Sequence, residues 1–217
     1  MDGELNVSEV FRSIQGETSR AGMPCTFVRL SGCNLRCAWC DTEYARDGEG
    51  TVMPLADVCR LVDEFGTHLV CMTGGEPLLQ GDAVAALAEH LLREGHLVTV
   101  ETNGTADISA VPEGVVRIMD VKCPGSGECG KTLPGNLSLL NARDEVKFVI
   151  ADRTDFDWAE CFIREHDLVN GPHFLFAPAH GRLAARDLAE WILESGLEVR
   201  LQLQLHRLIW PDRERGV

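Results

Sequence analysis

Short apolar runs alternate with longer amphipathic segments from residue 25 to residue 206, and this alternation restricts the fold more than any other feature of the sequence. The apolar runs, with the glycine-containing or polar loops that follow them, predict strands at 25–32, 68–75, 96–104, 115–127, 145–152, 173–181 and 198–206. Apolar residues at helical spacing predict helices at 54–66, 83–95, 154–166 and 183–196. Strands that alternate with helices form parallel sheets, so we expect an α/β fold with a mainly parallel sheet.

One crossover departs from this pattern. Between the strand at 115–121 and the strand at 145–150 lies a stretch rich in glycine and asparagine, with no clear helix, which predicts a shortened crossover. No internal repeat or long disordered linker divides the sequence, so we expect a single domain over residues 1–217.

The charge balance and the N-terminal residues limit the class of protein. The formal net charge is −14, from 34 acidic and 20 basic residues, whereas a nucleic-acid-binding protein usually has a basic surface. The sequence has no run of about 18 apolar residues, and its acidic start MDGELNVSEVFRS lacks the apolar core of a secretory signal. We therefore expect a cytoplasmic protein that binds neither nucleic acid nor a membrane.

Nine cysteines are an odd number in a chain with no signal for an oxidising compartment, which argues against a disulfide scaffold. Four of them stand among apolar residues and are expected to be buried as small hydrophobic side chains: Cys25, Cys59, Cys71 and Cys161. Cys123 and Cys129 flank a loop rich in proline and glycine, and the sequence assigns them no role.

The remaining cysteines, Cys33, Cys37 and Cys40, follow a predicted strand at Cys-x3-Cys-x2-Cys spacing, with Trp39 before the last of them. A structural zinc ion normally takes four protein ligands, and no second cysteine or histidine pair stands at suitable spacing. A [4Fe–4S] cluster is usually held by thiolates, and three of them leave one iron open for another ligand. The spacing favours the cluster, with a zinc ion or unliganded thiols as the alternatives.

Polar and glycine-rich residues gather where the predicted strands end. They are the segments 74–77, 101–104 and 120–122, the three cysteines after the strand at 25–32, and His206 after the last strand. Because ligands bind at the C-terminal edge of such sheets and barrels, we expect these side chains to form one site.

The segment CNLRCAWC resembles the cluster loop of the radical SAM superfamily, in which S-adenosylmethionine (SAM) binds the open iron of a [4Fe–4S] cluster. TGGEP, residues 73–77, is similar to the motif that receives the SAM amino group, which implies contacts from Gly75 and Glu76. ETNG, residues 101–104, is similar to the strand end that contacts the SAM ribose, which implies Glu101 and Asn103.

Two longer segments, 11–42 and 201–210, resemble the 7-carboxy-7-deazaguanine synthase family within that superfamily. The resemblance implies an incomplete, modified (β/α) barrel and the ring contraction of 6-carboxy-5,6,7,8-tetrahydropterin to 7-carboxy-7-deazaguanine with loss of ammonia. This carbon–nitrogen lyase reaction serves the biosynthesis of queuosine, a tRNA modification, and of other 7-deazapurines. The family further implies a Mg2+ requirement, a homodimer, and an electron donor such as flavodoxin or ferredoxin.

The same resemblance implies the residues of the site. Substrate contacts fall on Ile14, Gln15, Gly16, Glu17, Arg29, Thr73 and His206, with Glu17 facing the guanidine-like edge of the pterin and Arg29 its carboxylate. The Mg2+ ligand falls on Thr42, with Asp41 as its hydrogen-bonding neighbour. Further SAM contacts fall on Asp120, Val121 and Lys122, where only the lysine agrees with the commoner Ser-Pro-Lys. Thr18 stands where the family usually has glycine, and Arg207 where lysine is common.

Two other functions fit part of these features. A radical SAM activase shares the cysteine spacing and acts on a partner protein, but the segments IQGE and FVRL argue against it. A non-enzymatic iron–sulfur or zinc module has no use for TGGEP and ETNG at one sheet edge.

Overall fold

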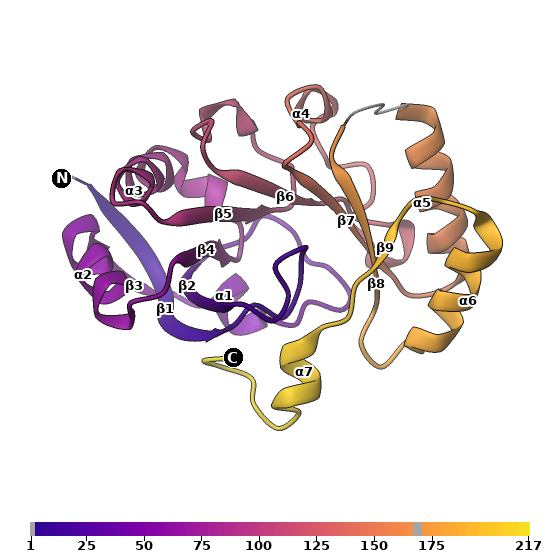
Figure 1. Cartoon of the computed structure of the whole chain (residues 1–217), viewed down its shortest axis with the longest axis horizontal. Helices are drawn as coiled ribbons and strands as arrows, with labels where there is room; N and C mark the ends of the chain where they lie inside the picture. Colours follow the sequence, from indigo (N-terminus) through magenta and orange to yellow (C-terminus); the bar gives the residue numbers. More distant parts are fainter. Residues whose placement is uncertain (1–2, 167–170) are drawn as a thin grey trace.

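The computed structural model describes residues 3–166 and 171–217 and contains one curved sheet with helices on its outer side (Figure 1). Its strands are β1 (Glu4–Ile14), β2 (Pro24–Leu30), β3 (Thr51–Pro54), β4 (Leu69–Gly74), β5 (Leu97–Thr102), β6 (Val116–Asp120), β7 (Glu145–Ile150), β8 (His173–Pro178) and β9 (Arg200–Leu201). The helices are α1 (Glu43–Asp47), α2 (Leu55–Phe65), α3 (Gly81–Arg93), α4 (Pro134–Leu137), α5 (Arg153–His166), α6 (Ala185–Ser195) and α7 (Leu205–Ile209). Short 3-10 turns occupy η1 (Pro77–Gln80), η2 (Ile108–Ala110) and η3 (Pro124–Ser126).

The strand order is β3-β1-β2-β4-β5-β6-β7-β8-β9. From β2 to β9 every neighbouring pair is parallel, whereas β1 is antiparallel to both β2 and β3. Among the residues described, the first and last strands of this order do not pair with each other, so the sheet stays open. The expectation of an α/β fold with an incomplete (β/α) barrel and a mainly parallel sheet is confirmed.

The two faces of the sheet carry different residues because successive side chains of a strand point to opposite sides. Val28, Met72 and Val100 point outward and pack with α2 and α3 in one core, while Phe148 and Phe176 pack with α5 and α6 in another. On the inner face Phe11 stacks on Phe27, with ring centroids 5.0 Å apart, in a small cluster with Cys25, Leu69 and Cys71. The inner cluster forms the floor on which the polar site is built.

The structure corrects several expectations. The strands β1 and β3 were not predicted from the sequence. The last strand is shorter than predicted: β9 covers only Arg200–Leu201, and His206 lies in α7. Cys25, Cys59 and Cys71 are buried as expected, but Cys161 is exposed. It lies on the solvent side of α5, because Phe156 and Ala159 occupy the face of that helix that meets the core. The shortened crossover after β6 is confirmed, since its α-helix has only four residues.

Among the residues described, no helix has both the length and the apolar character needed to cross a membrane.

Candidate active site

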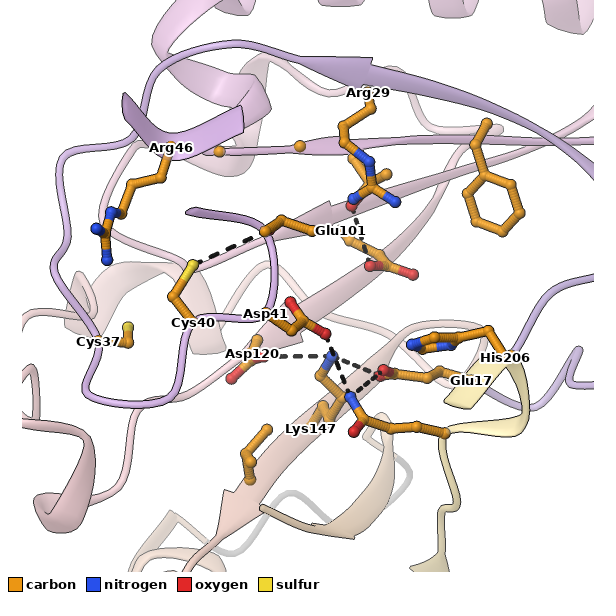
Figure 2. A pocket seen from close by; sticks show the side chains of 18 of the residues that line it. Glu17, Arg29, Cys37, Cys40, Asp41, Arg46, Glu101, Asp120, Lys147 and His206 are labelled. Carbon is orange, nitrogen blue, oxygen red and sulfur yellow. Dashed lines mark hydrogen bonds and ion pairs between the residues drawn. The ribbon is translucent and has the colours of Figure 1, made fainter. Parts of the chain in front are cut away.

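A cleft opens at the C-terminal edge of the sheet and gathers nearly all of the residues that the sequence singled out (Figure 2). The predicted residues that line it are Ile14, Gln15, Gly16, Glu17, Arg29, Cys33, Cys37, Cys40, Thr42, Thr73, Gly75, Glu101, Asn103, Asp120, Lys122 and His206. They come from the ends of β1, β2, β4, β5 and β6, from the loops that follow, and from α7. Two predicted SAM contacts, Glu76 and Val121, do not line the cleft.

The cysteine loop is held against the end of β4 by backbone contacts. Gly75 N–H donates to Leu30 O at 3.0 Å, and Glu76 N–H donates to Gly32 O at 2.8 Å. A Cβ atom on Gly75 would collide with the backbone of Gly32 and Cys33, so glycine is needed for this approach. Cys33, Cys37 and Cys40 form no disulfide, and all three line the cleft.

Two thiols of this loop, Cys33 and Cys37, ionise less readily than ordinary thiols. Partial burial raises the pKa of Cys33 and of Cys37, and the neighbouring Cys40 adds to both shifts. Lys122 opposes the shift at each of them. Three thiols in one loop, whose negative charges would repel one another, suit a cationic iron centre. The donor set therefore fits a [4Fe–4S] cluster.

Glu76 supports the cleft from behind instead of facing it. Its side chain is fully buried, and its carboxylate accepts hydrogen bonds from Thr102 Oγ1 at 2.7 Å and from the backbone N–H of Asn103 at 2.6 Å and Leu78 at 3.0 Å. It thereby fixes the end of β5, from which Asn103 reaches the cleft. Val121 is also buried, and its backbone N–H donates to Lys147 O at 2.9 Å.

A chain of buried charges crosses the cleft floor opposite the cysteines. Lys147 Nζ lies 2.7 Å from Glu17 Oε2 and 3.3 Å from Asp120 Oδ2, and Lys122 Nζ lies 2.9 Å from Asp120 Oδ1. Burial alone would raise the pKa of Glu17, but the Lys147 ammonium outweighs burial and, with a hydrogen bond from Gln204, lowers it to about 2. Glu17 is thus an anion throughout the neutral range.

Lys147 and Gln204 were not singled out by sequence reasoning. Lys147 stands in the middle of the apolar run EVKFVI, and a charged residue inside a buried strand is a signal that could have identified it. Its partner could not be read from the sequence, because the contact depends on the register that places Asp120 beside Lys147.

Glu101 lies on the inner face of β5 and accepts a hydrogen bond from Thr73 Oγ1 at 3.1 Å. Desolvation raises the pKa of this carboxyl group, and the nearby Lys147 opposes the shift. Thr73 and Glu101 therefore form a polar pair in the wall between the cysteine loop and the charged floor.

The loop after β1 and the helix α7 meet at the other wall of the cleft. Leu205 N–H donates to Gly16 O at 2.9 Å, and Gln204 Nε2 donates to Glu17 Oε1 at 2.9 Å. A side chain on Gly16 would collide with the His206 ring, so the two residues are in close contact. Burial lowers the pKa of His206, although the Glu17 and Asp41 carboxylates oppose this.

Thr18, a position at which the resemblance implies glycine, has a φ of 68°, a left-handed conformation that glycine adopts readily. Threonine at position 18 therefore strains the backbone next to Glu17.

Thr42 stands at the start of α1, and its hydroxyl does not cap that helix. This hydroxyl and the half-exposed Asp41 carboxylate both face the cleft. Oxygen atoms from the carboxylates of Glu17 and Asp41 and a ring nitrogen of His206 lie within 4.8 Å of one another. Hydroxyl and carboxylate oxygens are donors that Mg2+ prefers, and few protein ligands suit an ion that keeps its waters. In chemical type, though not by a measured separation, the oxygen donors of Thr42 and Asp41 fit Mg2+.

Comparisons with known proteins define first the class and then the family. Residues 27–120 match the model of the radical SAM superfamily, which covers the cysteine loop and the ends of β4, β5 and β6. A crystal structure of QueE from Escherichia coli has a TM-score of 0.77 and 21% sequence identity, and covers 93% of this chain and 94% of that chain. The fold is that of a radical SAM protein, and the segment that matches the superfamily model includes the three cysteines.

Sequence relatives identify the family within this superfamily. The 7-carboxy-7-deazaguanine synthase of Koribacter versatilis is 44% identical, over 98% of this chain and all of that protein. The protein of the same name from Chlorobaculum tepidum is 42% identical, over 100% of this chain and 99% of that protein. The chain belongs to the 7-carboxy-7-deazaguanine synthase family, and this membership implies a [4Fe–4S] cluster and SAM.

Proposed function

We propose that this chain converts 6-carboxy-5,6,7,8-tetrahydropterin to 7-carboxy-7-deazaguanine and ammonia, as a carbon–nitrogen lyase on the route to queuosine and other 7-deazapurines. The observation that carries the proposal is the division of one cleft into two halves. Cys33, Cys37 and Cys40 line one half, and the buried Glu17 anion with its Lys147 partner lines the other. Such a cleft would hold a charged heterocycle opposite an iron–sulfur centre, which supports the proposal.

The cysteine half would hold the cofactors. When bound there, the reduced [4Fe–4S] cluster and SAM would supply the radical chemistry that removes a hydrogen atom from the substrate. Gly75, Asn103 and Lys122 line this half and are the residues best placed to bind SAM by backbone and side-chain polar groups. Glu76 contributes by fixing the backbone at Asn103.

The charged half would hold the pterin. Glu17 presents a carboxylate with a pKa of about 2, and such an anion pairs with the adjacent N–H groups of the pterin guanidine edge. Lys147 keeps that carboxylate ionised and fixed in place. Arg29 lines the cleft from β2 and would receive the carboxylate of the substrate, while His206 and the backbone of Gln15 and Gly16 close the wall.

Mg2+ would bind at Thr42, with Asp41 beside it. Replacing Thr42 with valine is expected to raise the Mg2+ concentration for half-maximal activity by about tenfold or more, because the replacement removes a ligand oxygen at nearly constant volume. Replacing it with serine keeps the hydroxyl and is expected to change that concentration little. Titration of activity with MgCl2 after chelation measures both variants. An unchanged Mg2+ requirement in Thr42→Val contradicts the assignment.

The activity test uses protein reconstituted anaerobically with iron and sulfide, then supplied with SAM, dithionite, Mg2+ and 6-carboxytetrahydropterin. The expected result is a product with the ultraviolet absorption of a 7-deazapurine, one ammonia per product, and SAM that is not consumed in proportion to product. Cleaved SAM without this product contradicts the proposed substrate and favours an activase. Failure to form any cluster contradicts both enzyme functions.

The remaining features are proposed on the family resemblance alone. We infer that flavodoxin or ferredoxin supplies the electron in the cell and that the protein acts as a homodimer. Coupled reduction by each carrier and sedimentation analysis of the reconstituted protein test the two inferences separately.

A further inference from the structure

A cluster of side chains behind Arg29 has no part in the function described so far. Its centre is Glu9, on β1. Glu9 Oε1 accepts hydrogen bonds from Arg29 Nε at 2.9 Å and from the Tyr44 hydroxyl at 2.6 Å, and Glu9 Oε2 accepts from Gly216 N–H at 3.2 Å. Glu9 and Tyr44 do not themselves line the cleft, whereas Arg29 does. Arg29 is therefore the residue that connects Glu9 and Tyr44 with the cleft, which Arg213, Glu214 and Val217 of the following C-terminal segment also line.

These contacts fix one edge of the Arg29 guanidinium and leave the other edge free. Nε is bound to Glu9, and the central carbon lies 5.4 Å from the centre of the Phe11 ring and 6.0 Å from that of Tyr44. Within residues 3–166 and 171–217, the two terminal nitrogens of Arg29 make no hydrogen bond. Figure 2 shows this guanidinium directed into the cleft. A guanidinium held at one edge presents its two outer nitrogens in the geometry that binds a carboxylate bidentately.

The segment 211–217, which follows α7, secures the far side of Glu9. In Figure 1 this yellow segment returns toward β1 and β2. The guanidinium carbon of Arg215 lies 4.3 Å from the centre of the Tyr44 ring, and Gly216 provides the N–H bound by Glu9 Oε2. Gly216 has a φ of 69°, a left-handed conformation that favours glycine. Both carboxylate oxygens of Glu9 thus have hydrogen-bond donors, and the guanidinium of Arg215 packs against the ring of Tyr44.

We propose that Glu9, fixed by Tyr44 and by the segment 211–217, is the positioning residue that orients Arg29 and so determines selectivity for a carboxylated pterin. This inference rests on the proposed function, in which Arg29 receives the carboxylate of the substrate. A residue that only balanced the charge of a buried arginine would affect all ligands of the cleft alike. A positioning residue affects only the ligand that carries the carboxylate.

The experiment measures binding of pterin-6-carboxylate and of pterin to reconstituted, SAM-bound protein by quenching of pterin fluorescence. Wild type is expected to prefer the carboxylated ligand. Glu9→Gln is expected to weaken binding of pterin-6-carboxylate by about 10- to 100-fold, the range for a hydrogen bond with a charged partner, and to leave pterin binding unchanged. Tyr44→Phe and Arg215→Ala are expected to act in the same direction by about 3- to 10-fold.

Matched controls separate this effect from a general loss of structure. Glu4→Gln changes an exposed carboxylate on the same strand, and Asp212→Ala changes an exposed residue of the same segment, so neither is expected to alter either affinity. Iron content and melting temperature report on folding. Tyr44→Phe and Arg215→Ala carry the test if Glu9→Gln does not fold, because each removes one support and keeps the carboxylate.

Unchanged affinities in Glu9→Gln, Tyr44→Phe and Arg215→Ala, or an equal loss for both ligands, overturn the inference. If Arg29→Ala removes the preference and these three variants keep it, the inference fails and the proposed function stands. If wild type shows no preference for the carboxylated ligand, the assigned role of Arg29 fails, and the positioning role fails with it. In turnover, the inference further requires that KM for the carboxylated substrate rise more than kcat falls.

Discussion

Replacing Gly75 with alanine is expected to reduce turnover by about 100-fold or more, because catalysis of this kind is lost when reacting groups move by about 1 Å. The added methyl group would meet the backbone of Gly32 and Cys33, which cannot move aside as a flexible side chain can. The cysteine loop would therefore shift away from the end of β4, and Cys33 with it. Product formation, together with the cleavage of SAM in the absence of substrate, measures the loss.

Gly81→Ala is the matched control, because a methyl group there meets nothing within 4 Å. It is expected to keep full activity and cluster content. Gly75→Ala should lose most of its activity but keep a melting temperature close to that of wild type, since the altered contact lies at the sheet edge and not in either outer core. Wild-type turnover by Gly75→Ala would show that activity does not depend on the close contact between the cysteine loop and the glycine turn after β4.

Replacing Lys147 with methionine is expected to destabilise the protein by about 3–5 kcal/mol, because it leaves the buried carboxylate of Glu17 without its cation. For a chain of this size that loss lowers the melting temperature by about 6–20 °C. Calorimetry of the reconstituted protein measures it. Lys131→Met, which removes an exposed lysine paired with Glu128, is expected to have little effect.

The dependence of this effect on pH has a definite sign. In wild type the pKa of Glu17 is about 2, below its ordinary value of 4.5, so its contribution to stability is constant above pH 5 and is lost only as the pH falls below 4.5. In Lys147→Met, burial dominates and raises the pKa of Glu17, so stability should fall as the pH rises through that new value. Adding Glu17→Gln should restore much of the lost stability and remove this dependence. If the stability of Lys147→Met without the second substitution does not change between pH 5 and 8, the expected rise in the pKa of Glu17 is contradicted.

The sequence predicted the parallel part of the sheet because its strands are buried on the inner and outer faces and read as continuous apolar runs. It did not predict β1, in which Leu5 and Val7 face the outer core while Phe11 faces the inner cluster. A register shift between Val7 and Glu9 causes this change of face and breaks the alternation that would mark a strand. β3 is short and lies at the edge of the sheet, where little burial is needed.

Some residues of the candidate site could likewise be predicted from the sequence, and others could not. The cysteines, Gly75 and Asn103 carry local signals, since each stands in a motif at the end of a predicted strand. The roles of Gln204 and Lys147 could not be predicted from the sequence, because each depends on a contact with Glu17, which lies far away in the chain. LQLQLH alternates like a strand, yet β8 offers β9 partners only at Leu175 and Phe176, so the chain leaves the sheet and turns into α7.

The contact between Gln204 and Glu17 joins residues 187 positions apart, and it has a consequence for biosynthesis of the protein. Contacts so distant in sequence form late, because a long loop must close before they are made. On the ribosome, the strands that carry the cysteine loop and the glycine turn emerge well before Gln204. The half of the cleft proposed to hold the cluster can therefore form on the nascent chain, while the half proposed to bind the pterin is completed only after α7 has been translated.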